Sequence, residues 1–180
     1  MFPSFTPRYR AIDALAFVSL LLIFSILLSY ILFPKKSRAN MQKISLAISL
    51  LIITSPRLFT MFQDHSVTFC ESELVPATFL NLRCGMQAFL MIFGTHAAVL
   101  WASMRAYSVL ALITYQRSFT STRWIVGINV VCWGIPLAFS TGLILSKTVA
   151  YSFSGFCGPK ASLQPSLFFL PLLVCLVLCH

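Results

Sequence analysis

Three residues in one long apolar stretch are the first candidates for chemistry: His96, Trp101 and Arg105. At about 1.5 Å per residue, His96 lies about 17 Å along a helix that begins near residue 85, and Arg105 about 30 Å along it. If this helix spans a bilayer, His96 lies near the midplane. A polar residue at this depth predicts a ligand contact, a proton-sensitive switch or a hydrogen bond between helices. Arg105 reaches the inner interface, where it snorkels to headgroups or couples to a cytoplasmic partner.

No catalytic motif accompanies these residues. The sequence contains no H-E-x-x-H zinc motif, no G-x-S-x-G nucleophile motif and no G-x-x-x-x-G-K phosphate loop. It has only four acidic residues, and three of them lie between the second and third apolar stretches. Paired carboxylate chemistry inside a bundle is therefore disfavoured, and we expect neither an enzyme nor a bound metal or cofactor.

The composition indicates lipid as the solvent. Hydrophobic residues make up 58% of the chain and charged residues 9%, whereas a soluble domain has about 25% charged residues. The net charge of +9 comes from Lys and Arg in short connectors between apolar runs, which is typical of membrane topology and not of a nucleic-acid surface. Because isolated strands would leave backbone groups unpaired in lipid, the predicted fold class is an all-α, polytopic transmembrane helix bundle.

Five apolar stretches approach the length of about 20 residues that a helix needs to cross a bilayer. We expect spans at about residues 12–33, 44–61, 85–114, 124–146 and 163–180. The first run is too long for a signal peptide, and a basic segment follows it directly. Pro56 is expected to kink or end the second helix.

The distribution of basic residues predicts the orientation. The connectors 34–43 and 115–123 are short and basic and contain no acid, whereas the basic residues of the other side are spread over long stretches. The positive-inside bias acts through short loops close to span ends. We therefore expect these two connectors in the cytoplasm, residues 1–11 as a short extracellular N-terminus, and the plasma membrane as the location.

This orientation also places three of the cysteines on one side of the membrane. Cys70, Cys84 and Cys157 face the oxidising side, where disulfides persist, but their spacing does not decide which of them pair.

In the third span, small and polar residues recur at steps of three and four and share one face. They are Gly94, Ala98, Trp101, Arg105 and Ser108. This face either packs closely against another helix or lines a receptor core, and the two roles are compatible.

Short motifs in three spans resemble one receptor class. The third span carries Phe93-Gly94, Ala97-Ala98 and Leu100-Trp101 after Cys84; the fourth carries Trp133-Gly134-Ile135-Pro136, followed by Ser154-Gly155-Phe156-Cys157; the fifth carries Phe169-Leu170-Pro171-Leu172-Leu173-Val174. In this order they resemble Frizzled/Smoothened-like heptahelical receptors of the G-protein-coupled type. Fungal Frizzled-like and cyclic-AMP-receptor-like proteins share a looser form of the pattern. Over residues 12–180 the resemblance implies five spans of a seven-helix receptor, truncated within the fifth helix.

The resemblance also implies roles for particular residues. It implies a Cys84–Cys157 disulfide with Cys70 left over, and structural roles for the motif residues. These are Gly94, Ala98, Trp133, Pro136 and Pro171. The implied partners are the bilayer, an unknown extracellular ligand and a cytoplasmic G protein or other effector, with no nucleic acid.

Two departures from the class shape the functional hypothesis. Only about a dozen residues precede the first span, which argues against a Wnt-type ligand, and two helices of the class are missing. We therefore expect a receptor fragment that does not activate an effector alone. The alternatives are a small multipass transporter or channel and a non-signalling membrane scaffold. A transporter calls for polar or broken helices at the midplane, where this chain offers His96 and little else.

Overall fold

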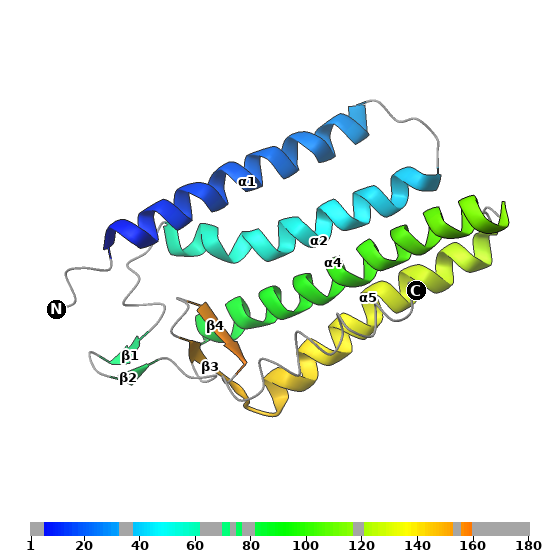
Figure 1. The fold of residues 1–180 in the computed structure, drawn as a ribbon. Helices are drawn as coiled ribbons and strands as arrows, with labels where there is room; N and C mark the ends of the chain where they lie inside the picture. Colours follow the sequence, from blue (N-terminus) through cyan, green and yellow to red (C-terminus); the bar gives the residue numbers. More distant parts are fainter. Residues whose placement is uncertain are drawn as a thin grey trace.

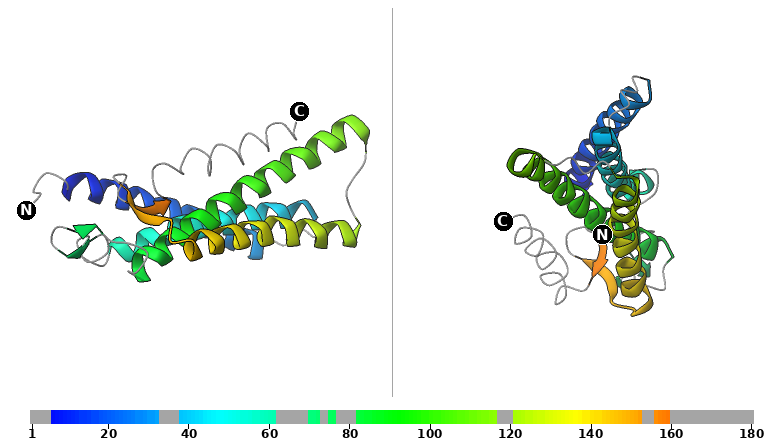
Figure 2. Two further views of the ribbon diagram at one scale, coloured as in Figure 1. Left: turned by 90° about the horizontal axis from the view of Figure 1, so that it is seen from below. Right: turned by 90° about the vertical axis from the view of Figure 1, so that its right-hand side faces the viewer.

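The computed structural model describes residues 6–32, 38–61, 70–72, 75–76, 82–116, 121–152 and 156–159. The described helices are α1 (Thr6–Leu32), α2 (Arg38–Met61), α4 (Leu82–Tyr115) and α5 (Thr122–Leu145), and the strands are β1 (Cys70–Ser72), β2 (Val75–Pro76), β3 (Val149–Ser152) and β4 (Phe156–Pro159). The helices contact one another in the order α1, α2, α4, α5 and run along a common direction (Figures 1 and 2). The predicted fold class, an all-α transmembrane helix bundle, is confirmed.

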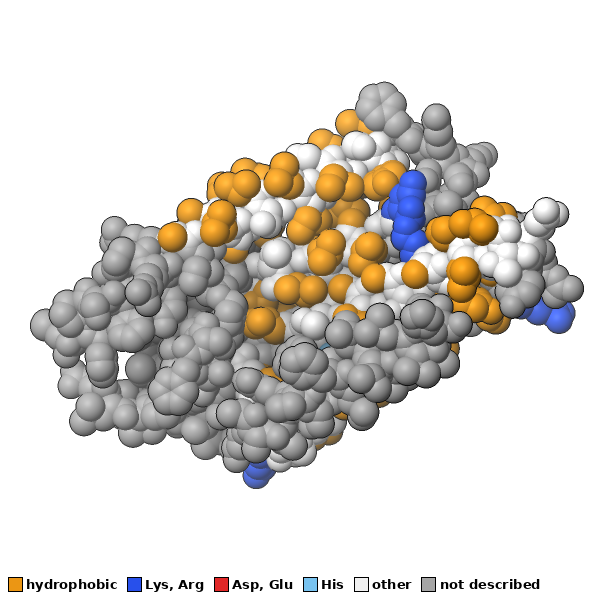
Figure 3. All heavy atoms as spheres, in the orientation of Figure 1, with side chains coloured by type: hydrophobic (Ala, Val, Ile, Leu, Met, Phe, Trp, Pro, Cys, Tyr) orange, Lys and Arg blue, Asp and Glu red, His pale blue; other side chains and the backbone are white. Residues whose placement is uncertain are grey.

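Three of the described helices are long and apolar enough to cross a membrane. Their apolar segments are Asp13–Leu32, Leu82–Thr114 and Arg123–Leu145, and α2 contributes the shorter segment Met41–Pro56. Large hydrophobic side chains such as Leu15, Phe24 and Ile31 are exposed along α1, and hydrophobic side chains cover much of the described surface of α1, α2 and α4 (Figure 3). An apolar surface of this extent marks a membrane or partner contact, and acyl chains can cover it in a bilayer.

The helices can be compared with the expected spans. Each of the first four expected spans coincides with a helix that begins two to six residues earlier, while the fifth span, with Pro171, lies outside the described residues. Helix α2 does not end at Pro56 but continues to Met61. Proline cannot donate to the carbonyl of Ile52, four residues earlier, and the Ser55 hydroxyl donates to that same oxygen at 2.9 Å. This substitute bond lets the helix pass through a proline in an apolar solvent.

The contact between α2 and α4 depends on a glycine. A Cβ atom on Gly94 would lie 2.7 Å from Ile53 Cγ1 and 3.1 Å from the Ser49 carbonyl oxygen. Ser49 is fully buried, and its hydroxyl donates to the Ser45 carbonyl within α2, so it presents no unpaired donor to the interface. The absence of a side chain at Gly94 therefore allows the two helix backbones to approach closely.

The contact between α4 and α5 is built from larger groups. One buried cluster joins Ala97 and Trp101 of α4 to Ile128 and Cys132 of α5. A second cluster lies nearer the N-terminal end of α4 and includes Ile92 and Cys84 of α4, Val149 of β3 and Cys157 of β4. Helix α4 thus packs against α2 and α5 and reaches the strand that follows α5.

Two strand pairs lie at the end of the bundle where α1 and α4 begin (Figures 1 and 2). Strands β1 and β2 form one antiparallel pair, and β3 and β4 form the other. In the second pair, Tyr151 lies opposite Cys157, and both strands contact α4. Lys147, with φ of 58°, turns the chain from α5 toward β3. The β3–β4 hairpin therefore returns over the N-terminal end of α4.

Candidate functional site

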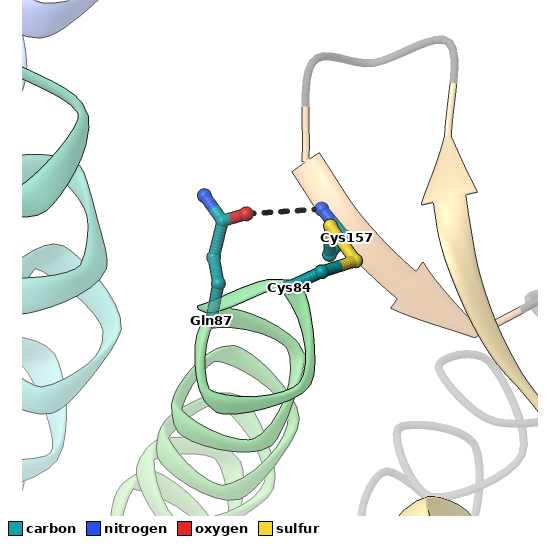
Figure 4. Close-up of a disulfide and its surroundings, with 3 residues drawn as sticks. All are labelled: Cys84, Gln87 and Cys157. Atoms are coloured by element: carbon teal, nitrogen blue, oxygen red, sulfur yellow. Dashed lines mark hydrogen bonds between the residues drawn. A yellow bond between two sulfur atoms is a disulfide. The ribbon is translucent and has the colours of Figure 1, made fainter. Parts of the chain in front are cut away.

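The β3–β4 hairpin is attached to α4 at two points. Cys84 in the first turn of α4 forms a disulfide with Cys157 of β4, and their Cα atoms are 5.3 Å apart. One turn further along α4, the Gln87 Oε1 atom accepts a hydrogen bond of 3.2 Å from the backbone N–H of Cys157 (Figure 4). Both cysteines and Gln87 are buried. The cysteine pair that the resemblance implied is thus the pair that the structure joins, with Cys70 in β1.

Sequence reasoning missed Gln87. Its Nε2 atom is buried and has no hydrogen-bond partner among the described residues. A signal was present in the sequence: Gln87 precedes Gly94, Trp101 and Ser108 by whole heptads, so it extends the face that they share. A polar side chain near the start of an apolar helix, on its packing face, is a candidate for a functional contact.

His96 is buried between α4 and α5. Its Nδ1 atom lies 2.7 Å from the Ile92 carbonyl oxygen, and its ring centroid is 4.8 Å from that of Phe139 on α5. Because a carbonyl oxygen only accepts, this contact assigns the proton to Nδ1. The bond of Nδ1 therefore stays within α4, whereas the ring of His96 contacts α5 through a tilted pair with Phe139. The predicted ligand or switch role of His96 stays a prediction.

Trp101 occupies the core between α4 and α5. It is 1% exposed, and its ring centroid lies 6.0 Å from that of Trp133, which is also 5.8 Å from Phe93. Trp133 of the Trp-x-x-Pro motif therefore packs against two successive aromatic residues of α4. Pro136 of the same motif is buried in α5, and Ala98 is half-buried in α4. The Trp101 Nε1 atom has no hydrogen-bond partner within the described ranges.

Arg105 lies further toward the C-terminal end of α4 and is half-buried. Nearby along the same helix, the Ser108 hydroxyl oxygen accepts a hydrogen bond of 3.1 Å from Gln42 Nε2 of α2. Nine residues, or about 13.5 Å of helix, separate His96 from Arg105. The three residues singled out first therefore lie along α4 at successive depths and do not converge on one point.

The described residues offer little for metal or acid–base chemistry. Within the ranges that the structure describes, no three residues of the types His, Cys, Asp and Glu lie close enough together to hold a metal ion. A covalently held hairpin covers one end of α4, and α4 continues through two different helix interfaces to the other end.

Comparison with known proteins assigns the chain to a family. A family model described as the slime mold cyclic AMP receptor matches residues 8–179. The chain belongs to this family. The family consists of membrane receptors, in agreement with an integral, multi-pass protein and with the apolar helices. Of the two receptor branches that the motifs resemble, the match falls on the cyclic-AMP-receptor-like one, and the Frizzled-like resemblance stays a prediction.

A curated relative points the same way over a shorter range. Cyclic AMP receptor-like protein C from Dictyostelium discoideum is 39% identical over 51 residues, which are 28% of this chain and 14% of the relative. The match therefore spans about one seventh of that protein's length.

Proposed function

We propose that this protein is a transmembrane signalling receptor whose ligand binds at the end of the bundle that bears the β3–β4 hairpin. The single observation that carries this proposal is the double attachment of Cys157 to α4, through the disulfide and through Gln87. A hairpin fixed in this way holds one shape over the helix end, which a binding site requires. Membership of a receptor family supports the proposal.

Cyclic AMP is the first candidate ligand. The family model and the curated relative both carry it in their descriptions, while the matched part of the relative is short. The candidate is a small, soluble, anionic molecule, which suits a site at the mouth of a bundle. In this proposal a G protein or another effector reads the opposite end.

The proposed orientation puts the hairpin end and the N-terminus outside the cell, in the plasma membrane. The disulfide supports this side because disulfides persist in oxidising compartments. The basic connectors 34–43 and 115–123 join the helices at the other end, which agrees with the positive-inside bias.

Signal transmission is proposed to run along α4. The polar tie between Gln42 and Ser108 and the close approach at Gly94 hold α4 to α2, whereas rings form much of its contact with α5. Ring contacts are less directional than a hydrogen bond, so we place the moving interface between α4 and α5. A ligand shifts this packing only if it binds one arrangement more tightly than the other.

Binding to intact cells tests the proposal. The chain is expressed in cells without endogenous cyclic AMP receptors, and radiolabelled cyclic AMP is added outside. We expect saturable binding that unlabelled cyclic AMP displaces and that the Cys84→Ser, Cys157→Ser double variant loses at equal surface expression. A membrane-impermeant thiol label should react with a cysteine placed at Ser72 and not with one at Ser37. Labelling at Ser37 alone would overturn the orientation, and absence of displaceable binding would overturn cyclic AMP as the ligand.

A further inference from the structure

The two polar atoms of the Gln87 side chain have different surroundings. The backbone N–H of Cys157 can only donate, so the atom that faces it at 3.2 Å must be the amide oxygen. This bond fixes the amide orientation and directs the NH₂ group to the other side. Gln87 is 4% exposed, and no acceptor among the described residues reaches its Nε2 atom. The side chain therefore holds a buried donor in a fixed direction.

A buried donor without an acceptor is unusual in a native protein. Nearly all buried polar groups have a hydrogen-bond partner. A buried group without one loses its hydrogen bonds to water and gains nothing in return, which destabilises the fold. The oxygen end of Gln87 already secures the hairpin, so this half of the amide explains why a glutamine helps to hold the fold. The nitrogen end needs a different explanation, and an acceptor supplied by a ligand provides one.

The direction of this donor indicates the chemistry of that ligand. The Gln87 side chain extends toward the N-terminal end of α4, and its Nε2 atom lies on the side away from Cys157 (Figure 4). The N-terminal end of a helix carries partial positive charge and favours anions. The first turn of α4 contains Arg83 and no acidic residue. A donor, the helix dipole and this local charge together favour an oxygen atom with negative charge.

We propose that Gln87 Nε2 and the N-terminal end of α4 form a subsite for an anionic oxygen group of the extracellular ligand, such as a phosphate or a carboxylate. The inference rests on the proposed function for the side from which the ligand arrives. It assigns Gln87 two roles: the oxygen positions the hairpin and the nitrogen binds the anion. Occupation of the subsite links the ligand directly to α4 and β4.

Inorganic phosphate is a probe that needs no knowledge of the natural ligand. The whole chain is placed in nanodiscs of phosphatidylcholine, and Tm is measured while phosphate replaces chloride at constant ionic strength. We expect Tm to rise with phosphate concentration and to saturate. In Gln87→Glu an oxygen still accepts from Cys157, but a negatively charged acceptor replaces the donor. The apparent phosphate affinity should therefore fall about tenfold or more.

Gln116→Glu is the matched control. It makes the same change of amide to carboxylate at an exposed residue just beyond the other end of α4. This control should keep the phosphate response of the unmodified chain. A wild-type chain without any phosphate response, or equal responses in wild type and Gln87→Glu, would overturn the proposal.

A second variant covers the case in which Gln87→Glu does not fold. Gln87→Met removes the donor without adding charge, and formation of the Cys84–Cys157 disulfide, measured by mass spectrometry, reports a native hairpin. We expect this variant to lose the phosphate response with its disulfide intact. A folded Met variant that keeps the response would contradict the assignment.

Two further measurements separate the sources of the anion and the two proposals. Nanodiscs with phosphatidylglycerol and no phosphate should leave Tm of the wild type and of Gln87→Glu equally changed, because the proposed anion comes from solution. A Gln87-dependent effect of that lipid would assign the site to a lipid headgroup and overturn the proposal.

The cyclic AMP binding experiment separates the two proposals. If cyclic AMP fails to bind while the Gln87-dependent phosphate response persists, the assignment of cyclic AMP as the ligand is wrong and the subsite stands. If cyclic AMP binds Gln87→Glu as well as wild type, the subsite is wrong.

Discussion

The two interfaces of α4 are built on opposite principles. Toward α2, the contact relies on a missing side chain at Gly94 and on one hydrogen bond between Gln42 and Ser108. Toward α5, it relies on large rings, with Trp133 lying against both Phe93 and Trp101. The first interface tolerates no added volume, whereas the second depends on volume being present. In a bilayer, where burial of apolar surface does not drive helix association, packing and hydrogen bonds supply the specificity in both cases.

The hairpin adds a third attachment to the α5 side. Because β3 and β4 follow α5 in the chain, the disulfide connects the segment after α5 back to the start of α4. The ring-packed interface is therefore closed covalently at one end, and the α2 interface has a polar tie toward the other end. This difference predicts how each interface responds to substitution.

The largest effect should come from opening the covalent closure. The double change Cys84→Ser, Cys157→Ser releases a closure between residues separated by 73 positions. In the chain-entropy model such a closure contributes about 4 kcal/mol to stability. We expect a clear drop of Tm in detergent, measured beside the wild type with and without reductant. Reductant should lower Tm of the wild type toward that of the variant. An unchanged Tm would mean that ring packing alone holds α4 to α5 and the hairpin.

The next effect should come from adding volume at the α2 interface. In Gly94→Val, the new side chain meets Ile53 and the backbone of α2, and overpacking of this kind costs about 3 kcal/mol. Thermal unfolding and surface expression are the measurements. Gly134→Val on α5 is the control, because nothing lies within 4 Å of a Cβ atom at that position. Equal losses in both variants would show that helix propensity, and not interface volume, limits stability.

A smaller effect is expected from removing rings at the α5 interface. Trp133→Leu keeps an apolar side chain but loses two ring pairs, each worth about 1 kcal/mol, so the loss should be about 2 kcal/mol. Phe24→Leu on the exposed face of α1 makes a comparable change outside any interface and should leave Tm close to that of the wild type. A Trp133→Leu variant as stable as Phe24→Leu would show that the ring pairs of Trp133 do not stabilise the contact between α4 and α5.

The smallest effect should come from the polar tie. Hydrogen bonds between transmembrane helices average about 0.6 kcal/mol, so Ser108→Ala and Gln42→Leu should show a coupling of that size in a double-mutant cycle. Ser25→Ala is the control, since its hydroxyl bonds to Leu21 of its own helix and is exposed. Coupling near zero between Ser108 and Gln42, or coupling of equal size between Ser25 and Gln42, would show that the hydrogen bond between Gln42 and Ser108 does not stabilise the α2–α4 contact.

The sequence predicted the helices well because a bilayer imposes length and composition directly. Runs of apolar residues near 20 in number have few alternatives, and the first four expected spans coincide with helices. The role of Gln87 was harder to see, since its partner Cys157 is 70 residues away. His96 shows the same limit at short range: its Nδ1 atom faces the carbonyl four residues earlier in its own helix, which a depth argument does not reveal.

By itself, the sequence determined that the chain is a membrane helix bundle and which face of α4 carries small and polar residues. It could do so because hydrophobic length and helical periodicity are local properties of the chain. Only the tertiary structure decided that Gly94 meets α2, that Trp101 meets Trp133 of α5, and that Gln87 secures the hairpin with its oxygen while its nitrogen has no partner among the described residues. Those pairings depend on how helices distant in sequence are rotated against one another, and rotation is settled by the fit of both surfaces together.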